Sequence, residues 1–108
     1  LTADIYENTN EYIIEVELPG VDPANASVEI QEHTLQVKGF VEKTRHDGKE
    51  YTRIVSKRKR GELIRHFFLP KEVDAKSATA KLEKGVLTIT IKKSVRPEAP
   101  QVIEVQIN

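Results

Sequence analysis

Apolar and polar residues alternate with a period of two along most of the chain, which is the pattern of β-strands with one covered face. The clearest runs are residues 11–18, 27–31, 35–41 and 86–91. No run has the period of a helix, and Asp22–Ala26 predicts at most a turn after Pro23. We therefore expect an all-β fold of short antiparallel strands.

Turn signals separate these runs. Leu18-Pro19-Gly20-Val21 ends the first one, and a short turn near Glu32 and His33 joins the next two. Lys84-Gly85 predicts a hairpin between the apolar alternation at residues 78–82 and the last run. Strands at this spacing predict an immunoglobulin-like sandwich of two antiparallel sheets.

Two segments in the middle of the chain differ from the others. Residues 63–69 are partly apolar on both faces, which predicts a central strand that is covered on both sides. Residues 42–60 are polar and predict a long loop, which contains the turn signal His46-Asp47-Gly48 and a weak strand candidate at Tyr51–Val55.

The end of the chain behaves differently from the domain. Residues 94–101 include two prolines and lack periodicity, which predicts an extended, flexible linker. Alternating apolar residues follow at Ile103, Val105 and Ile107, and they predict a terminal strand with no hairpin partner in the sequence. We divide the chain into a domain at residues 1–93 and a C-terminal extension at residues 94–108.

The composition excludes several classes of function. The 17 Lys and Arg residues balance the 17 Asp and Glu residues, which argues against a protein that mainly grips nucleic acid. The absence of cysteine removes disulfides, thiolate metal sites and cysteine nucleophiles. Apolar runs are too short for a membrane span, and no apolar signal segment opens the chain, so we expect a cytoplasmic protein.

Charge is distributed unevenly along the chain. Residues 1–37 contain eight acidic residues and no Lys or Arg, whereas the loop at residues 42–60 has a net charge of +5. Opposite charges of this size should attract each other within or between chains. The run Lys57-Arg58-Lys59-Arg60 has only Tyr51 as a nearby aromatic residue, which favours a solvated or interface role over nucleic-acid binding.

The sequence contains no pattern typical of a catalytic site. His33, His46 and His66 fall on separate elements, without the close spacing of a zinc site. The five glycines are scattered singly, so we expect no phosphate-binding loop and no ATP. We therefore predict a protein that is not an enzyme and has no catalytic residues, metal or cofactor.

Four motifs resemble the α-crystallin domain of the small heat shock proteins, over nearly the whole chain. They are Leu18-Pro19-Gly20-Val21, residues 61–70, residues 80–87 and the terminal alternation. The long loop is similar to that of the bacterial, archaeal and plant members. The resemblance implies an ATP-independent chaperone, a holdase, that binds unfolding client proteins and forms dimers that assemble into larger oligomers.

The resemblance also implies a dimer contact, in which a strand in the loop pairs with the first strand of the partner subunit. The residues implied for this interface are Asp4, Ile5, Tyr6, Tyr51, Arg53, Val55 and Arg65. Arg65 aligns with an arginine to which assembly in the family is sensitive. Because the loop is basic and the start of the chain is acidic, we expect salt to weaken the dimer.

A tail contact is the second interface that the resemblance implies. In the family, an Ile-x-Ile/Val motif lies in a groove at the sheet edge of a neighbouring dimer, and both Ile103-Glu104-Val105 and Val105-Gln106-Ile107 fit this motif. We expect the groove, which would also receive clients by strand addition, at Val28, Ile30, Ala80 and Leu82.

The sequence departs from the family pattern at its start. Family members usually carry a variable apolar arm before this domain, whereas this chain begins at Leu1, almost at the first strand of the domain. Leu63 stands where the family favours an aromatic residue. The alternative is a monomeric, co-chaperone-like sandwich that binds a folded partner; the long loop and the apolar terminal strand favour the holdase.

Overall fold

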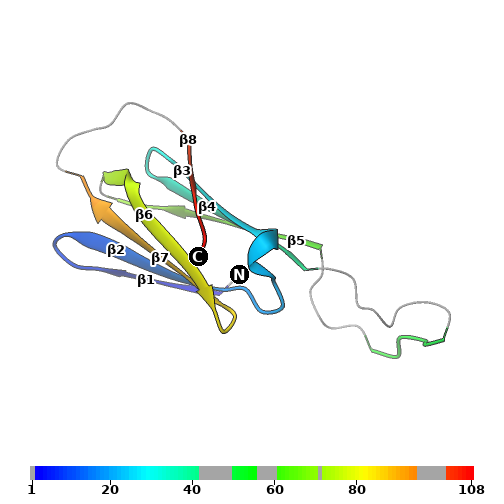
Figure 1. Ribbon diagram of the computed structural model, residues 1–108. Coiled ribbons are helices and arrows are strands. Elements are labelled where there is room, and N and C mark those ends of the chain that lie inside the picture. Colours follow the sequence, from blue (N-terminus) through cyan, green and yellow to red (C-terminus); the bar gives the residue numbers. More distant parts are fainter. Residues whose placement is uncertain (1, 42–49, 56–60, 71, 95–101) are drawn as a thin grey trace.

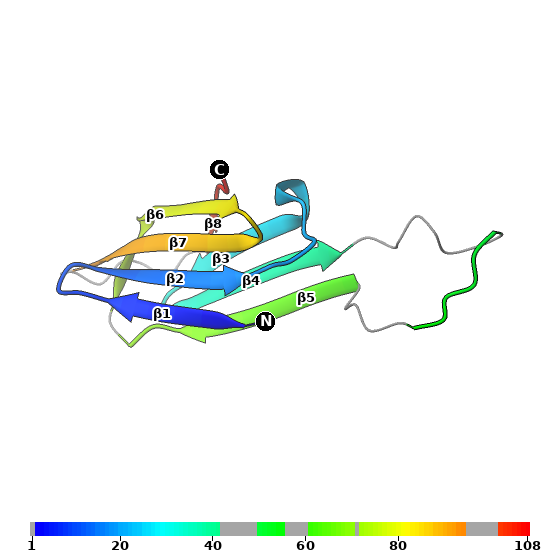
Figure 2. The same ribbon diagram turned by 90° about the horizontal axis from the view of Figure 1, so that it is seen from below.

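Two antiparallel sheets face each other in the computed structural model, which describes residues 2–41, 50–55, 61–70, 72–94 and 102–108. The strand orders are β1-β2-β7-β6 and β5-β4-β3-β8 (Figures 1 and 2). This confirms the all-β sandwich that the alternation predicts. The elements are β1 Ala3–Glu7, β2 Glu11–Glu17, the 3-10 helix η1 Pro23–Asn25, β3 Ala26–Gln31, β4 Thr34–Val41, β5 Gly61–Phe68, β6 Val73–Glu83, β7 Val86–Lys93 and β8 Val102–Val105.

The core lies between the two sheets and is built from alternate residues of the strands. In the first sheet, Ile14 of β2 pairs with Ile89 of β7, and both side chains are fully buried. In the second sheet, Val37 of β4 pairs with Val28 of β3, and both are at most 1% exposed. Each such side chain stabilises the fold by roughly 1.5–3 kcal/mol.

The motif Leu18-Pro19-Gly20-Val21 forms a tight turn that closes one end of the core. The backbone N–H of Val21 donates to the carbonyl of Leu18 at 3.2 Å, and Gly20 has a φ of 79°. Proline second and a positive φ third describe a type II turn. A Cβ at Gly39 would lie 3.3 Å from the side chains of both Leu18 and Val21, so any larger residue at this strand position would require those side chains to shift by a few tenths of an ångström.

The hairpin predicted at Lys84-Gly85 is confirmed. Both residues have positive φ values, 53° and 77°, as a two-residue turn that matches the twist of its strands requires. Glu32, with a φ of 56°, begins the equally short turn between β3 and β4. The short helix η1 agrees with the turn expected after Pro23.

The first hairpin, β1 with β2, was not predicted by the alternation. Its turn is organised by Asn8, whose Oδ1 accepts hydrogen bonds from the backbone N–H groups of Asn10 and Glu11, both at 2.8 Å. This side-chain turn lets a short strand fold back onto β2. The strand β1 lies at the edge of its sheet.

The prediction of a covered central strand at residues 63–69 was wrong. Within the described residues, β5 lies at the edge of its sheet and pairs only with β4. Its outer face leaves Ile64 44% exposed and Phe68 74% exposed. Apolar residues on both faces predict a covered strand, whereas here they mark an exposed surface at the edge of a sheet.

The strand β6 begins at Val73, earlier than the alternation indicates. Its register against β7 shifts between Asp74 and Thr79. In this bulge the Ser77 hydroxyl donates to the carbonyl of Asp74 at 2.6 Å and accepts from the backbone N–H of Lys92 at 2.9 Å. The shift breaks the period of two, which explains why only the second half of the strand was recognisable.

Candidate functional site: the tail groove and the open edge

The terminal strand β8 fills a groove beside β3. Val105 lies opposite Val28 and Ile103 opposite Ile30, in an antiparallel register. Val105 is 8% exposed, while Val28 and Ile30 are buried beneath it. The alternation of the tail therefore puts its branched side chains onto the core.

Beyond β8 the tail crosses to the other sheet. Ile107 makes a parallel bridge to Ala80 of β6, and the backbone N–H of Asn108 donates to the carbonyl of Ala80 at 2.7 Å. The N–H of Leu82 donates to the carbonyl of Asn108 at 3.1 Å. The tail thus joins both sheets along one side of the sandwich, where β8 lies across the opening in Figure 1.

The structure brings together the tail residues and the groove residues that the sequence predicted, but within one chain. The resemblance implied a groove on a neighbouring dimer, whereas here the tail occupies the groove of its own chain. Both alternatives for the motif are used in part, since Ile103 and Val105 face β3 while Ile107 reaches β6.

The outer face of the tail carries charge. Glu104 of β8 lies directly opposite Glu29 of β3, and the row continues across the sheet to Gln36 and His66. Like charges at directly opposed positions destabilise a strand pair. A polar hollow of about 320 Å³ lies over these strands and is lined by Glu29, Gln31, Glu32, Thr34, Gln36 and His66.

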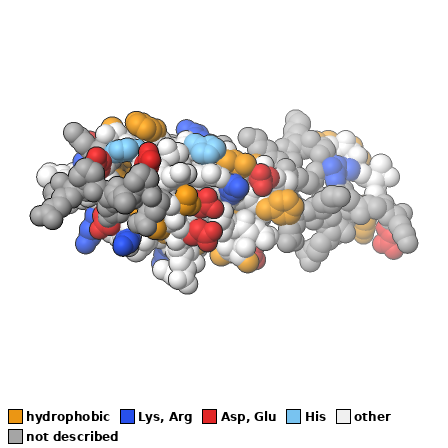
Figure 3. Space-filling view, turned by 90° about the horizontal axis from the view of Figure 1, so that it is seen from above, with side chains coloured by type: hydrophobic (Ala, Val, Ile, Leu, Met, Phe, Trp, Pro, Cys, Tyr) orange, Lys and Arg blue, Asp and Glu red, His pale blue; other side chains and the backbone are white. Residues whose placement is uncertain are grey.

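Among the residues that the structure describes, no strand covers the other side of the sandwich. The edge strands β1 and β5 lie on the same side of the molecule, as Figure 2 shows. Ile5 is 47% exposed and Tyr6 is 53% exposed on β1. Figure 3 shows apolar side chains exposed among charged ones on another face. An unpaired edge with exposed apolar side chains can accept a further strand.

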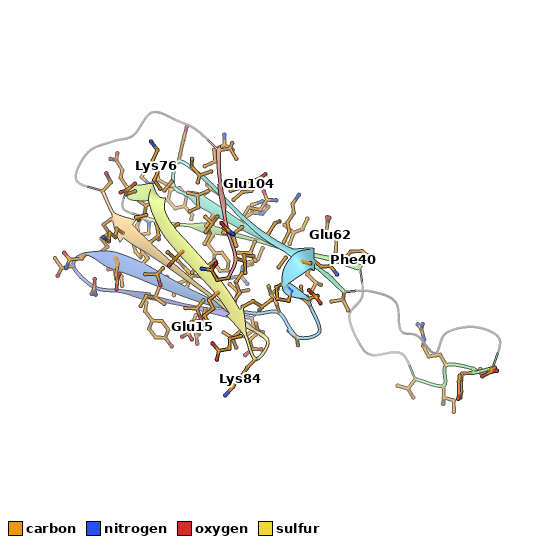
Figure 4. The ribbon with its side chains drawn as sticks, viewed as in Figure 1. Glu15, Phe40, Glu62, Lys76, Lys84 and Glu104 are labelled. Atoms are coloured by element: carbon orange, nitrogen blue, oxygen red, sulfur yellow. The ribbon has the colours of Figure 1, made fainter. Side chains whose placement is uncertain are left out.

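An acidic pair lies on the outer face of the first hairpin, β1 with β2. Asp4 lies directly opposite Glu15 of β2, which is labelled in Figure 4. The negative charges of Asp4 and Glu15 raise the pKa of the Tyr6 phenol above its ordinary value. Glu7 differs, because its carboxylate lies 3.4 Å from Nζ of Lys93. Asp4 and Glu15 therefore form an acidic pair at this edge, whereas Glu7 is paired with Lys93.

The structure does not bring the loop residues of the predicted dimer interface to β1. Tyr51, Arg53 and Val55 are exposed, and residues 50–55 form no strand, so the weak strand candidate does not pair within the single chain. This segment lies away from the sandwich in Figure 1. The remaining loop residues, including Lys57-Arg58-Lys59-Arg60, lie outside the described residues, as does most of the predicted linker.

Arg65 lies on the edge strand β5. Its guanidinium carbon is 5.0 Å from the centre of the Phe67 ring, and the Phe67 side chain is buried. A cation over an aromatic face is stabilised by the ring's negative face. The predicted interface arginine is thus held in place at the open edge.

The described residues meet the requirements of neither a metal site nor a membrane-spanning helix. Across the part of the chain that the structure describes, no three His, Asp or Glu side chains lie together in a way that could hold a metal ion. In the same residues, no helix has the length and apolar character needed to cross a membrane.

Sequence reasoning missed the two acidic pairs, Glu29 with Glu104 and Asp4 with Glu15. Each pair joins residues from different strands, so only the register reveals it. A signal for the second pair was present, since alternation in Ala3–Glu7 before two asparagines is compatible with a hairpin.

Comparison with known proteins identifies the family. Residues 4–108 match the Hsp20/alpha crystallin family. The chain is 36% identical to the 17.4 kDa class III heat shock protein of Arabidopsis thaliana, over 99% of this chain and 72% of that protein. It is 33% identical to the 17.1 kDa class II heat shock protein of Pisum sativum, over 97% of this chain and 70% of that protein.

Solved structures agree with this match. Heat shock protein 16.0 of Schizosaccharomyces pombe superposes with a TM-score of 0.79 at 28% identity, covering 93% of this chain and 91% of that one. A small heat-shock protein from Xylella fastidiosa superposes with a TM-score of 0.70 at 35% identity, covering 93% of each chain. The sandwich, its motifs and these matches together show that the chain belongs to the Hsp20/alpha crystallin family of small heat shock proteins.

Proposed function

We propose that this protein is an ATP-independent holdase that binds unfolding proteins at its strand edges and prevents their aggregation. The observation that carries the proposal is the tail, an extended segment seated by backbone hydrogen bonds and branched side chains in a groove between the sheets. An unfolding protein offers extended apolar segments of the same kind. Members of this family are chaperones rather than enzymes, which supports the proposal.

The tail is suited to exchange because its docking is weak. Full burial of a branched side chain contributes roughly 1.5–3 kcal/mol, and the partly buried Ile103 and Ile107 contribute less than the buried Val105. Ordering the backbone opposes this by about 1–2 kcal/mol for each residue fixed. These opposing contributions largely cancel and leave the docked tail favoured by no more than a few kcal/mol. A single tail therefore opens readily, and several tails on one particle hold it together through high effective concentration. Assembly and client binding would then compete for Val28, Ile30, Ala80 and Leu82.

Dimerisation is the second part of the proposal. Tyr51, Arg53 and Val55 of one chain would pair with Asp4, Ile5 and Tyr6 of another, with Arg65 at the same open edge. The exposed apolar side chains of β1 and its acidic outer face support this arrangement, because the loop carries a net charge of +5. We propose the cytoplasm as the compartment of this activity.

The direct test heats a client protein with and without this chain, in the absence of nucleotide, and follows light scattering. A holdase suppresses the scattering at a substoichiometric to equimolar ratio of dimers to client, and added ATP changes nothing. An equal mass of a folded protein without exposed edges serves as the control. Scattering that matches the control would refute the proposal.

A monomeric binding module is the second candidate, and one observation favours it: the tail closes the groove of its own chain. A self-contained sandwich of that kind would bind a folded partner through its surface. Analytical ultracentrifugation separates the candidates, since a monomer at micromolar concentration supports the module and a dimer or larger particle supports the holdase.

A further inference from the structure

The two faces of the docked tail have opposite effects on its binding, since the inner face stabilises the docked state and the outer face destabilises it. On the inner face, Ile103 and Val105 bury branched side chains against Ile30 and Val28. On the outer face, Glu104 stands opposite Glu29. Among the described residues, neither carboxylate forms an ion pair. The groove therefore holds its own tail against a repulsion that a different central residue would remove.

We propose that this groove binds an extended segment with a Lys or Arg between two branched apolar residues more tightly than it binds the segment Ile103-Glu104-Val105 of its own tail. The apolar residues would take the places of Ile103 and Val105. The basic residue would take the place of Glu104 and face Glu29. An opposite charge at a directly opposed position stabilises a strand pair, whereas a like charge destabilises it.

The surroundings of Glu29 support a basic partner. Glu29 is half-buried and lies beside the polar hollow, to which Glu32 contributes a second carboxylate. The row across the sheet contains uncharged Gln36 and then His66, while Lys38 lies only on the diagonal from Glu29. The long stem of a Lys or Arg can follow the sheet surface while its charged end reaches these carboxylates.

The preference has a consequence for exchange. The chain's own tail has the advantage of being tethered, which gives it a high local concentration. A segment with a basic central residue has no tether, but its attraction to Glu29 compensates for this, because Glu104 of the tail is repelled by Glu29. This inference rests on the exchange of tail and client proposed above, and it adds which clients exchange best.

The test measures binding of labelled seven-residue peptides to the full chain by fluorescence anisotropy. The first peptide copies residues 102–108 but has Lys in place of Glu104. The second has the same composition with the two central polar residues exchanged, so that Gln replaces Glu104 and Lys replaces Gln106. The third is the unchanged tail sequence. All three meet the same competition from the tethered tail, so that their ratios report the groove alone.

We expect the first peptide to bind about three- to tenfold more tightly than the unchanged sequence, with the second in between. On the Glu29→Lys variant the order should invert, and on Glu29→Gln the difference should shrink. Salt should reduce the preference because the pair is near the surface. Equal binding of the first and third peptides, or an order that Glu29→Lys leaves unchanged, would overturn the inference.

The failure of this inference is distinguishable from the failure of the proposed function. Peptides that bind without regard to the central charge overturn the charge preference and leave exchange at the groove intact. Peptides that all fail to bind, even at millimolar concentration, overturn exchange at this groove and the inference with it, whatever the aggregation assay shows.

Discussion

Single residues set the local geometry on which the groove depends. Gly20 is the clearest case, because the third position of its turn has a φ of 79°. A side chain in this left-handed region costs about 1–2 kcal/mol for most residues and less for asparagine. The turn carries Leu18 and Val21 onto Gly39, so a strained turn would loosen one end of the core.

Replacing Gly20 tests this reading directly. Gly20→Ala should lower the free energy of unfolding by about 1–2 kcal/mol, because alanine resists a positive φ. Gly20→Asn serves as the matched variant and should lose less than half as much. Urea titrations followed by circular dichroism measure both. Equal losses for the two variants would show that packing, rather than the backbone conformation, decides the effect.

At this scale the sequence predicted apolar contacts and missed charged ones. The tail residues were identifiable because alternation tells which side chains face a core, whereas the groove residues were implied by the family resemblance. The pairs Glu29 with Glu104 and Asp4 with Glu15 depend on register between strands that lie far apart or were not recognised. A shift of one residue turns every side chain to the other face, so such pairs need the structure.

At the scale of elements, the tail strand is the unit whose stability decides the behaviour of the molecule. It is short, and it is attached to two sheets at once through β3 and β6. Removing one buried side chain should therefore release the whole segment rather than loosen one contact.

Two substitutions on β8 test whether burial of a side chain, rather than its position on the strand, stabilises the docked tail. Val105→Ser removes a side chain that is 8% exposed, and it should accelerate amide hydrogen exchange in the tail about five- to thirtyfold, for a loss of about 1–2 kcal/mol. Val102→Ser, at a position that is 55% exposed, is the control and should change exchange little. If tails hold the oligomer together, light scattering should also find mainly dimers for Val105→Ser. Identical exchange in the two variants would contradict a groove held by apolar burial.

Elements with clean alternation and clear turns were predicted well, while those shaped by tertiary context were not. The hairpin at Lys84-Gly85 is recognisable from its turn residues. By contrast, the early half of β6 is hidden by a bulge, and the edge position of β5 follows only from which strands lie beside it. A run of residues cannot show whether its apolar outer face is covered.

At the scale of the whole molecule, the two long sides of the sandwich are unequal. One side is closed by the tail, and the other leaves the edges of β1 and β5 open (Figure 2). The open side carries the acidic residues Asp4 and Glu15, and the sequence opposes them with a loop of net charge +5.

If a partner's loop docks on this edge, salt should weaken the dimer. Raising the salt concentration from about 0.05 M to about 0.5 M shortens the range of charge interactions to a few ångströms. Sedimentation velocity should then report a dissociation constant several-fold higher. Asp4→Asn with Glu15→Gln should weaken the dimer at low salt and flatten this dependence.

Glu83→Gln is the control for the loss of surface charge, since Glu83 pairs with Lys81 at 2.8 Å on another edge. It should leave both the dissociation constant and its salt dependence close to those of the unchanged chain. A dimer that responds to neither salt nor the change at Asp4 and Glu15 would rule out electrostatic docking at this edge.

The bulge in β6 limits the length over which a further strand could pair with this edge of the sheet. A flat, regular margin invites one copy after another to stack into a fibre. The irregularity at Asp74–Thr79, pinned by Ser77, leaves straight backbone only over the stretch that receives Ile107 and Asn108. A further strand could therefore pair along only a few residues of β6, which is too short a stretch to template a continuous cross-β fibre.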